Sequence, residues 1–225
     1  VQLHFFKVDK DKMANYEAVM SEYYQKRAQS WIDNGCQVYW ELRRIKPNST
    51  GFSRQFNYMA VDVLPVGKNS RAGCNLEFNS GLSDGIENIM TQIVSDKDRV
   101  FSTRLKYVTG YGNDAGTPVK SARIEFQRVF QMSKYINSHK DDLRDMLKKY
   151  SNRTDWHAFQ RNSADAVGSR EWNYMIFNAI DNSKQSNIPK KVSDSFRKKW
   201  GQDRTKLRDI RYVVQADLVT YASSR

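Results

Sequence analysis

The chain has 225 residues, of which 39% are hydrophobic and 12% aromatic, and it carries a formal net charge of +12. This apolar and aromatic content suffices for a packed core and excludes a disordered chain. No apolar run reaches the roughly 20 residues of a membrane-spanning helix. The two cysteines, Cys36 and Cys74, are too few for a disulfide-rich scaffold and lack the CxxC spacing of a metal or redox motif. They either pair with each other or remain two buried thiols.

Most of the positive charge lies in the second half of the chain. Lys184–Arg211 holds ten basic and three acidic residues, a composition typical of a solvated basic helix. The competing interpretation is a binding surface for an anionic polymer such as nucleic acid. The aromatic strand pattern of RNA-recognition modules is absent, so we prefer the solvated helix and disfavour a nucleic-acid partner.

In the first half, alternating and helical periodicities predict the order β-α-β-β-α. The first strand alternates, with Leu3 and Phe5 on one face, and the helix after it carries an aromatic stripe up to an Asn-Gly stop signal. The elements are Val1–Val8, Lys12–Asn34, Gln37–Ile45, Arg54–Leu64 and a helix from Ile86 that extends to about Tyr107. One strand of a ferredoxin-like βαββαβ unit is missing from this order. It lies either in Tyr107–Tyr111 or in the segment Pro118–Ser133, which would then serve both halves.

The second half predicts the same order with its last strand in place, and so a complete ferredoxin-like unit. A clear strand is followed by a shorter helix, two further strands, a basic helix and a final strand. These elements are Ala122–Ser133, Tyr135–Tyr150, Thr154–Gln160, Arg170–Ile180, a helix from about Ser193, and Tyr212–Tyr221.

One heptapeptide links the two halves. Ser53-Arg54-Gln55-Phe56-Asn57-Tyr58-Met59 returns as Ser169-Arg170-Glu171-Trp172-Asn173-Tyr174-Met175, with each residue 116 positions later, and Trp40 and Trp156 precede the two copies at the same offset. An offset of this size is too long for a solenoid repeat and suits two modules of ordinary domain size. We therefore predict two ferredoxin-like modules, residues 1–117 and 118–225.

With this doubled motif, the chain resembles the dimeric α/β-barrel superfamily, and in particular exported bacterial proteins of that superfamily that carry two copies in tandem. The resemblance implies that the two antiparallel sheets pack into one intramolecular α/β barrel. It also implies a pocket between sheet and helices in each module, for a flat apolar ligand. The superfamily includes cofactor-independent monooxygenases of aromatic polyketides, heme-degrading and chlorite-dismutase-like heme proteins, and plain binding proteins. We expect binding of a small apolar or aromatic ligand, with a cofactor-independent or heme-linked monooxygenase as the alternative and the cofactor unknown.

The repeated strand supplies the predicted ligand-binding residues. If the strand is regular, Arg54 and Arg170 share a face with the aromatic residue two positions on and with Tyr58 and Tyr174. Such a column could clamp a flat acidic ligand by a charge-assisted hydrogen bond and stacking. It could equally be inherited core packing, which is the interpretation we prefer. The predicted ligand-binding set is Trp40, Arg54, Tyr58, Trp156 and Arg170.

For catalysis, the predicted residues are His157 and Tyr174. His157 follows Trp156 on a strand and so points to the opposite side of the sheet, where it could line a pocket as a general base or axial ligand. The competing interpretation is a structural or exposed histidine. The first module has Glu41 at the equivalent position, so two functional sites would differ chemically.

Several chemistries are not supported by the sequence. No pair of its three histidines has metal-ligand spacing, and no G-x-S-x-G, Walker or G-x-G-x-x-G motif is present. Nucleophilic catalysis by Ser or Cys is therefore not predicted. The chain begins at Val1 in place of Met, so we expect a removed signal peptide and an exported protein, periplasmic or extracellular.

Overall fold

The computed structural model describes residues 1–47, 55–68, 71, 74, 78–112, 118–161, 171–180, 183–200 and 206–224. Two of the predicted ligand-binding residues, Arg54 and Arg170, lie outside these ranges.

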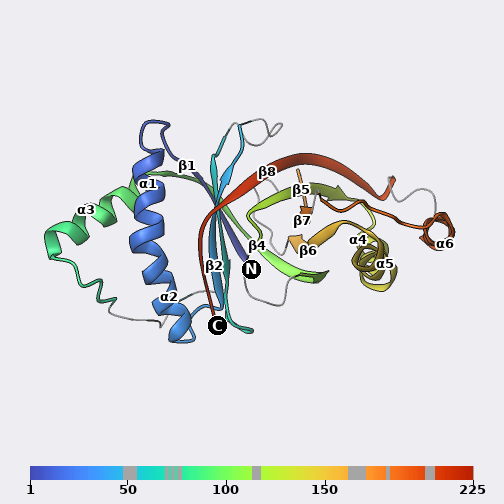
Figure 1. Ribbon diagram of the computed structural model, residues 1–225, viewed down its shortest axis with the longest axis horizontal. Coiled ribbons are helices and arrows are strands. Elements are labelled where there is room, and N and C mark those ends of the chain that lie inside the picture. The colour runs from blue at the N-terminus through green and yellow to red at the C-terminus, as the bar shows by residue number, and fades with distance from the viewer. Residues whose placement is uncertain are drawn as a thin grey trace. The chain divides into compact units, whose positions relative to one another are not determined.

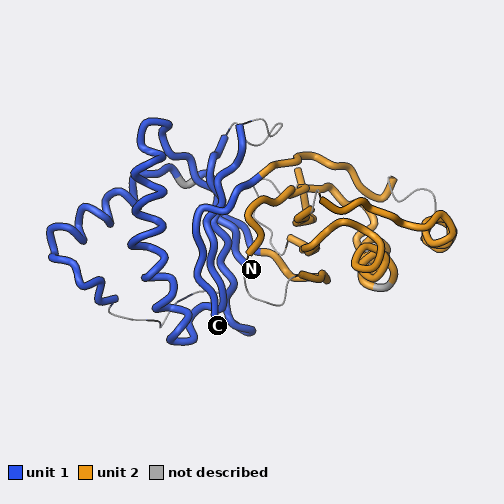
Figure 2. The backbone as a smooth tube through the Cα atoms, viewed as in Figure 1, with its two compact units in different colours: residues 1–104, 216–225 blue, residues 105–215 orange. Residues whose placement is uncertain are grey.

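Antiparallel strands carry the fold, hydrogen-bonded in the order β1-β3-β2-β8-β5-β7-β6-β4 as a closed barrel. The α+β class and the barrel expected from the sequence are thus confirmed. The chain divides into two compact units, unit 1 with residues 1–104 and 216–225 and unit 2 with residues 105–215 (Figure 2). Strands β4 (Asp98–Tyr111) and β8 (Arg208–Ser223) each contribute residues to both units.

Unit 1 places its helices along one face of its strands (Figure 1). Strand β1 pairs with β3 and with the first part of β4, and β2 pairs with β3 and the last part of β8. A π-helical turn, η1, joins α1 and α2 into one continuous helix. The elements of this unit are β1 (Gln2–Lys7), α1 (Met13–Val19), η1 (Met20–Tyr24), α2 (Gln25–Asp33), β2 (Tyr39–Ile45), β3 (Tyr58–Val63) and α3 (Asp84–Ser95).

Unit 2 repeats this arrangement. Strand β7 lies between β5 and β6, and the second part of β4 pairs with β6. Its first helix also contains a π-helical turn, η3. The elements are β5 (Ser121–Val129), α4 (Met132–Ser138), η3 (His139–Leu143), α5 (Arg144–Tyr150), β6 (Arg153–Arg161), β7 (Tyr174–Ile180) and α6 (Lys190–Trp200).

The predicted helix from Ile86 to Tyr107 is wrong in its second part, because α3 ends at Ser95 and β4 begins at Asp98. The helical spacing of the isoleucines stops at Ile93, and the residues that follow are rich in β-branched and aromatic side chains. Pairing with β1 and β6 gives this segment hydrogen-bond partners on both sides, which a longer helix would forgo. Strand β4 contains Tyr107–Tyr111, one of the two places that the sequence left open for the missing strand.

The aromatic stripe predicted on the first helix, and the matching helix of the second half, form the cores between helix and sheet. In unit 1, Tyr16 and Met20 pack with Trp40 and Tyr58, all at most 2% exposed. The corresponding core of unit 2 is built around Tyr135, Trp156, Tyr174 and Leu147. The repeated Trp and Tyr residues are thus core residues in both units.

The repeated asparagine makes the same four backbone contacts in each unit. Asn57 bonds through its side chain to the backbone N–H (2.9 Å) and C=O (2.7 Å) of Val8, and Asn173 bonds in the same way to Val129 (2.8 and 2.9 Å). The Asn57 backbone N–H donates to Phe6 and its carbonyl accepts from Ile45. The amide side chain thus satisfies backbone groups that a neighbouring strand would otherwise pair, at the turn just before β3 or β7 begins.

This turn corrects the predicted strand face. Strands β3 and β7 begin at Tyr58 and Tyr174, so the preceding aromatic residues do not follow the strand's alternation. Phe56 packs on Phe5, whereas Tyr58 packs on Tyr16 in the core that contains Phe6. Adjacent residues of β1 point to opposite faces, so Phe56 and Tyr58 do not form one column.

Cys36 and Cys74 form a disulfide with their Cα atoms 6.1 Å apart, which settles the alternatives that the sequence left open. The bond ties the residues before β2 to the segment that follows β3. Among the described residues, no helix is both long and apolar enough to cross a membrane.

Candidate functional site

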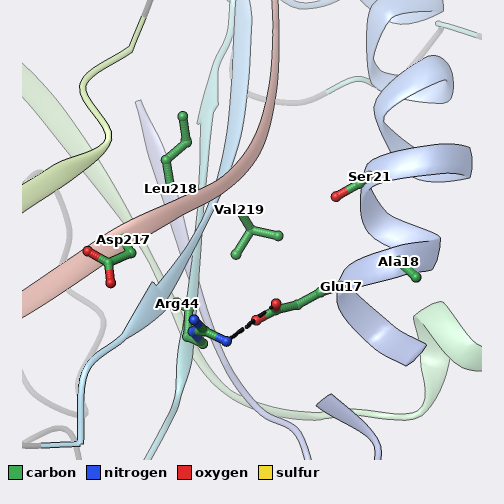
Figure 3. A pocket seen from close by; sticks show the side chains of 7 residues that line it. All are labelled: Glu17, Ala18, Ser21, Arg44, Asp217, Leu218 and Val219. Atoms are coloured by element: carbon green, nitrogen blue, oxygen red, sulfur yellow. Dashed lines mark hydrogen bonds and ion pairs between the residues drawn. The ribbon is translucent and has the colours of Figure 1, made fainter. Parts of the chain in front are cut away.

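A groove of about 300 Å³ lies in unit 1 between the first helix and the sheet. Its location matches the place that the resemblance implied for a ligand. The residues that line it are Glu17, Ala18 and Ser21 from the helix, Arg44 from β2, and Asp217, Leu218 and Val219 from β8 (Figure 3). The lining therefore combines charged and hydroxyl groups, on Glu17, Ser21, Arg44 and Asp217, with apolar surface from Ala18, Leu218 and Val219.

The charged part of the lining is organised by Glu17. Its carboxylate accepts from the Tyr58 hydroxyl at 2.7 Å and from Arg44 at 3.2 Å, and Figure 3 shows Arg44 reaching from β2 toward Glu17. Burial, followed by the hydrogen bond to Glu17, raises the pKa of Tyr58 above its ordinary value. Tyr58 therefore stays neutral and acts as a donor that orients the carboxylate.

A β-bulge places Val219 in the groove. Leu42 pairs with Thr220 and Arg43 with Leu218, so Val219 is the extra residue on β8. In Figure 3 its side chain points from β8 toward the helix, and it packs against the core of unit 1. Bulges re-aim side chains in this way at sheet edges and binding sites.

In unit 2 aromatic side chains pack around a histidine between helix and sheet. His139, fully buried on η3, stacks on Tyr174 with its Nδ1 at 2.8 Å from the hydroxyl. It also contacts Tyr135 edge to face and packs against Trp156. Trp156 and Tyr174, which the sequence proposed as site residues, thus meet each other around His139 inside a core.

Unit 2 has a cavity of about 480 Å³ at a different place, between α5 and α6. Its lining mixes acidic, basic and apolar side chains, and Lys199 pairs with Asp142 across it at 2.9 Å. The cavity lies between two helices, away from the position between sheet and helix that the resemblance implied.

His157 lies on the other face of β6, as its alternation with Trp156 predicts. Its Nε2 is 3.0 Å from Asp155, and Tyr107, Phe159 and Phe177 surround the ring with centroids 6.1 to 6.4 Å away. Tyr174 belongs to the opposite face, with the helices. The two predicted catalytic residues are therefore not brought together.

Gly110 on β4 and Gly112 just after it make room for the pair of His157 and Asp155. A Cβ on Gly110 would lie 2.4 Å from His157 Nδ1, and one on Gly112 would lie 2.1 Å from an Asp155 carboxylate oxygen. Since real Cβ atoms do not approach so closely, the glycines are required for this packing. His157 Nδ1 consequently faces the Gly110 backbone.

The described histidines do not fit the role of an axial heme ligand. His157 has one ring nitrogen on Asp155 and the other against Gly110. Both ring nitrogens of His4 are hydrogen-bonded, and His139 is fully buried with Nδ1 on Tyr174. Within the described ranges there is also no group of three His, Cys, Asp or Glu side chains able to hold a metal ion.

Trp40 is buried against Tyr24 in the core of unit 1 and does not line the groove. Of the predicted ligand-binding residues that the structure describes, Tyr58 is bonded to a groove residue, Glu17. The sequence reasoning missed Glu17, Arg44 and His139. Glu17 follows Tyr16 on the aromatic helix, and a carboxylate beside a buried stripe was the signal available for it.

Comparisons with known proteins agree at the level of the fold. No protein-family model matches the chain, and no curated protein matches it in sequence. A solved candidate monooxygenase from Lactobacillus acidophilus NCFM superposes with a TM-score of 0.55 at 8% identity, covering 99% of this chain and 94% of that one. A second candidate monooxygenase, from Fusobacterium nucleatum, gives 0.53 at 8% identity, with 99% and 93% covered.

At such identities the likeness shows a shared fold and leaves the chemistry open. The likeness therefore agrees with the barrel that the resemblance implied, at the level of the fold. The tandem repeat, the export and the site residues stay predictions.

Proposed function

We propose that this protein binds a small, neutral, hydroxylated aromatic molecule in the groove of unit 1. The observation that carries the proposal is the groove between helix and sheet, in which a carboxylate held by Tyr58 and Arg44 lies among apolar and polar side chains. Ligand sites are mostly apolar, with a few placed polar groups that orient the ligand.

The size and charge of the groove define the ligand class. Its volume of about 300 Å³ is at the lower end for ligand pockets, which suits a compound of one or two rings. Glu17 and Asp217 offer acceptors to a ligand hydroxyl, and Asp217 is itself paired with Lys46 at 3.1 Å. Arg44 and Lys46 are already paired with these two carboxylates, which disfavours an anionic ligand and differs from the acidic ligand considered for Arg54.

Calorimetric titration with 2-naphthol tests the proposal, and 2-naphthalenesulfonate serves as the anionic comparison. We expect saturable binding of 2-naphthol and at least tenfold weaker binding of the sulfonate. Ala18→Phe fills the groove from the helix and should abolish binding. Ser195→Phe makes the same kind of change in the cavity between α5 and α6 and should leave it unchanged.

Binding that survives Ala18→Phe, or that is lost in Ser195→Phe alone, would overturn the assignment to unit 1. The monooxygenase alternative is supported by the fold of the two solved neighbours, while His157 and Tyr174 lie on opposite faces. Oxygen consumption during incubation with 2-naphthol would revive that alternative, and its absence alongside binding would favour a binding protein.

We also propose that residues 1–117 and 118–225 are tandem ferredoxin-like copies. The shared element order, the paired π-helical turns and the identical contacts of Asn57 and Asn173 support this. The disulfide supports folding in an oxidising compartment, as expected for an exported protein.

The basic helix α6 is the feature that supports the alternative function of binding an anionic polymer. It has no acidic residue in its first turn and three basic residues, Arg197, Lys198 and Lys199, in its last. Retention on heparin that falls steeply with salt would support polymer binding, and weak retention would support a solvated helix.

A further inference from the structure

Three polar side chains on neighbouring strands of unit 1 form a hydrogen-bonded chain that the proposed groove does not use. His4 on β1 lies between Ser102 on β4 and Asp62 on β3. Its Nδ1 is 2.7 Å from Ser102 Oγ, and its Nε2 is 2.9 Å from Asp62 Oδ2. In the sequence, Asp62 lies 58 positions after His4 and Ser102 lies 98 positions after it. Only the fold brings the three residues together.

The sheet register makes this arrangement regular. His4 is directly opposite Ser102 in the antiparallel pair of β1 with β4, and directly opposite Ala60 in the pair of β1 with β3. Asp62 is two residues beyond Ala60 and therefore on the same face. Serine, imidazole and carboxylate thus run diagonally across three strands.

Asp62 is fixed as the acceptor end of the chain. Its side chain is 3% exposed, and its second oxygen accepts from Gln37 at 2.7 Å and from Arg71 at 2.9 Å. Burial opposes ionisation, but the hydrogen bond from His4 and the positive charge of Arg71 act against it, and the pKa of Asp62 falls below its ordinary value. The group is a carboxylate and can only accept.

An ionised Asp62 decides the tautomer of the imidazole. His4 must donate from Nε2 to the carboxylate, which leaves Nδ1 of the neutral ring as an acceptor for the Ser102 hydroxyl. This is the division of roles in serine acyl-transfer sites: a carboxylate orients the imidazole and the imidazole takes the serine proton. The two ring nitrogens are exchanged relative to the best-known arrangement, which alters the direction of attack and leaves the proton relay intact.

The chain is reachable and is specific to unit 1. The His4 side chain is 17% exposed and Ser102 is partly exposed. At the matched positions of the other sheet, Glu125 pairs with Ile176, and Asn178 lies two residues beyond. An amide cannot orient a histidine as a carboxylate does, so inherited packing does not account for the three residues.

We propose that Ser102 is a nucleophile, activated by His4 and oriented through Asp62, that accepts a short acyl group from an ester. Ser102 Oγ attacks the ester carbonyl while its proton passes to His4 Nδ1. The new bond joins Oγ to the acyl carbon, the carbon–oxygen bond to the alcohol breaks, and His4 returns the proton to the leaving alkoxide. The products are acyl-Ser102 and the free alcohol, and partial burial of the serine restricts the acyl group to a small one.

Incubation of the full chain with 4-nitrophenyl acetate tests this. We expect a burst of nitrophenolate close to one equivalent, with peptide mass spectrometry placing the acetyl group on Ser102. General-base assistance is worth roughly a hundredfold or more, so Ser102 should react far ahead of the exposed Ser121 in the same molecule. Ser102→Ala should abolish the burst, and Ser121→Ala should leave it unchanged.

His4→Gln and Asp62→Asn separate activation from mere exposure. Both should slow acetylation of Ser102 at least tenfold, with circular dichroism confirming that the variants fold. The ratio of Ser102 to Ser121 acetylation in the unmodified protein needs no variant. A ratio near one, or acetylation confined to lysines, would show that the three residues are only a satisfied polar network.

Discussion

Units 1 and 2 share their hydrogen-bonding frame and differ in the polar groups attached to it. Asn57 and Asn173 make the same four backbone contacts, and each unit has a helix with one π-helical turn beside its sheet. At the tyrosine that follows the asparagine the units diverge, because Tyr58 donates to the partly exposed Glu17 and Tyr174 pairs with the buried His139. A repeated frame therefore does not imply a repeated site.

The two tyrosine partners differ in exposure and in what holds them. Glu17 reaches outward and is held by Arg44 at the surface, which leaves space between helix and strand. In unit 2 the imidazole of His139 lies flat on Tyr174 in contact with Trp156, and it begins its π-helical turn as the buried Met20 does in unit 1. The groove of unit 1 therefore lies beside a helix–sheet core that is as buried as that of unit 2.

The largest expected loss of stability comes from replacing the two repeated asparagines. Asn57→Ala and Asn173→Ala each remove two side-chain hydrogen bonds to backbone groups of a neighbouring strand. Each lost bond costs about 1 kcal/mol, and more where a buried partner is left unpaired, so we expect each variant to lose about 2 to 3 kcal/mol in urea unfolding.

Equal losses of unfolding free energy in the two variants would show that Asn57 and Asn173 have the same role. A loss of less than about 0.5 kcal/mol in one of them would contradict a common frame. Asn34→Ala, which removes an exposed side-chain bond to a helix carbonyl, provides a matched control with a smaller expected effect.

Lowering the pH should remove a stabilising contribution of Asp62 in unit 1, whereas the matched residue of unit 2, Asn178, has no carboxylate. Its pKa lies below the ordinary value of 3.8 in the folded state, so its contribution to stability is present above that value and is lost as the pH falls below it toward the folded pKa. Asp62→Asn should therefore destabilise the protein at pH 7, and the difference from the unmodified protein should shrink below about pH 3.8.

The matched residue Asn178 provides the reverse test. It accepts from Arg153 at 2.9 Å, so Asn178→Asp places a carboxylate beside a cation and should add acid-dependent stability loss. Thermal melts across pH 3 to 7 measure both variants. An Asp62→Asn difference that does not change with pH would show that the carboxylate is not what stabilises this site.

The smallest expected effect concerns the buried tyrosines of the two first helices. Tyr135 donates to Gln127 at 2.7 Å, whereas the buried Tyr16 hydroxyl has no hydrogen-bond partner among the described residues. Tyr135→Phe should cost about 1 kcal/mol, and Tyr16→Phe should be neutral or slightly stabilising. Urea unfolding of the two variants checks this, and a clear loss in Tyr16→Phe would reveal a partner for that hydroxyl, such as bound water.

Most elements could be predicted from the sequence because hydrophobic periodicity reports which face of an element is buried. The strands at β1, β2, β5 and β6 and the aromatic helices were found in this way. The prediction failed at α3 and β4, where the helical spacing of the isoleucines ends a few residues before the strand begins. Only pairing with two distant strands decides that change, and local propensity carries no record of it.

The sequence could give less of the candidate site. It identified Tyr58, Trp156 and His157 as residues of interest, but alternation along an assumed strand placed Arg54, Phe56 and Tyr58 in one column. The turn at Asn57 changes that placement, and it depends on hydrogen bonds to Val8. Glu17 and Arg44 are 27 residues apart and carried no motif that would pair them.

By itself, the sequence determined the α+β class, the doubled motif and the aromatic faces of the helices, because each depends on local spacing or on internal repetition. The tertiary structure alone decided which groups meet: Tyr58 with Glu17, Tyr174 with His139, and Ser102 with His4 and Asp62. These contacts join separate strands and helices, and their geometry is set by sheet register and by where each turn begins. A short-range pattern does not contain that information.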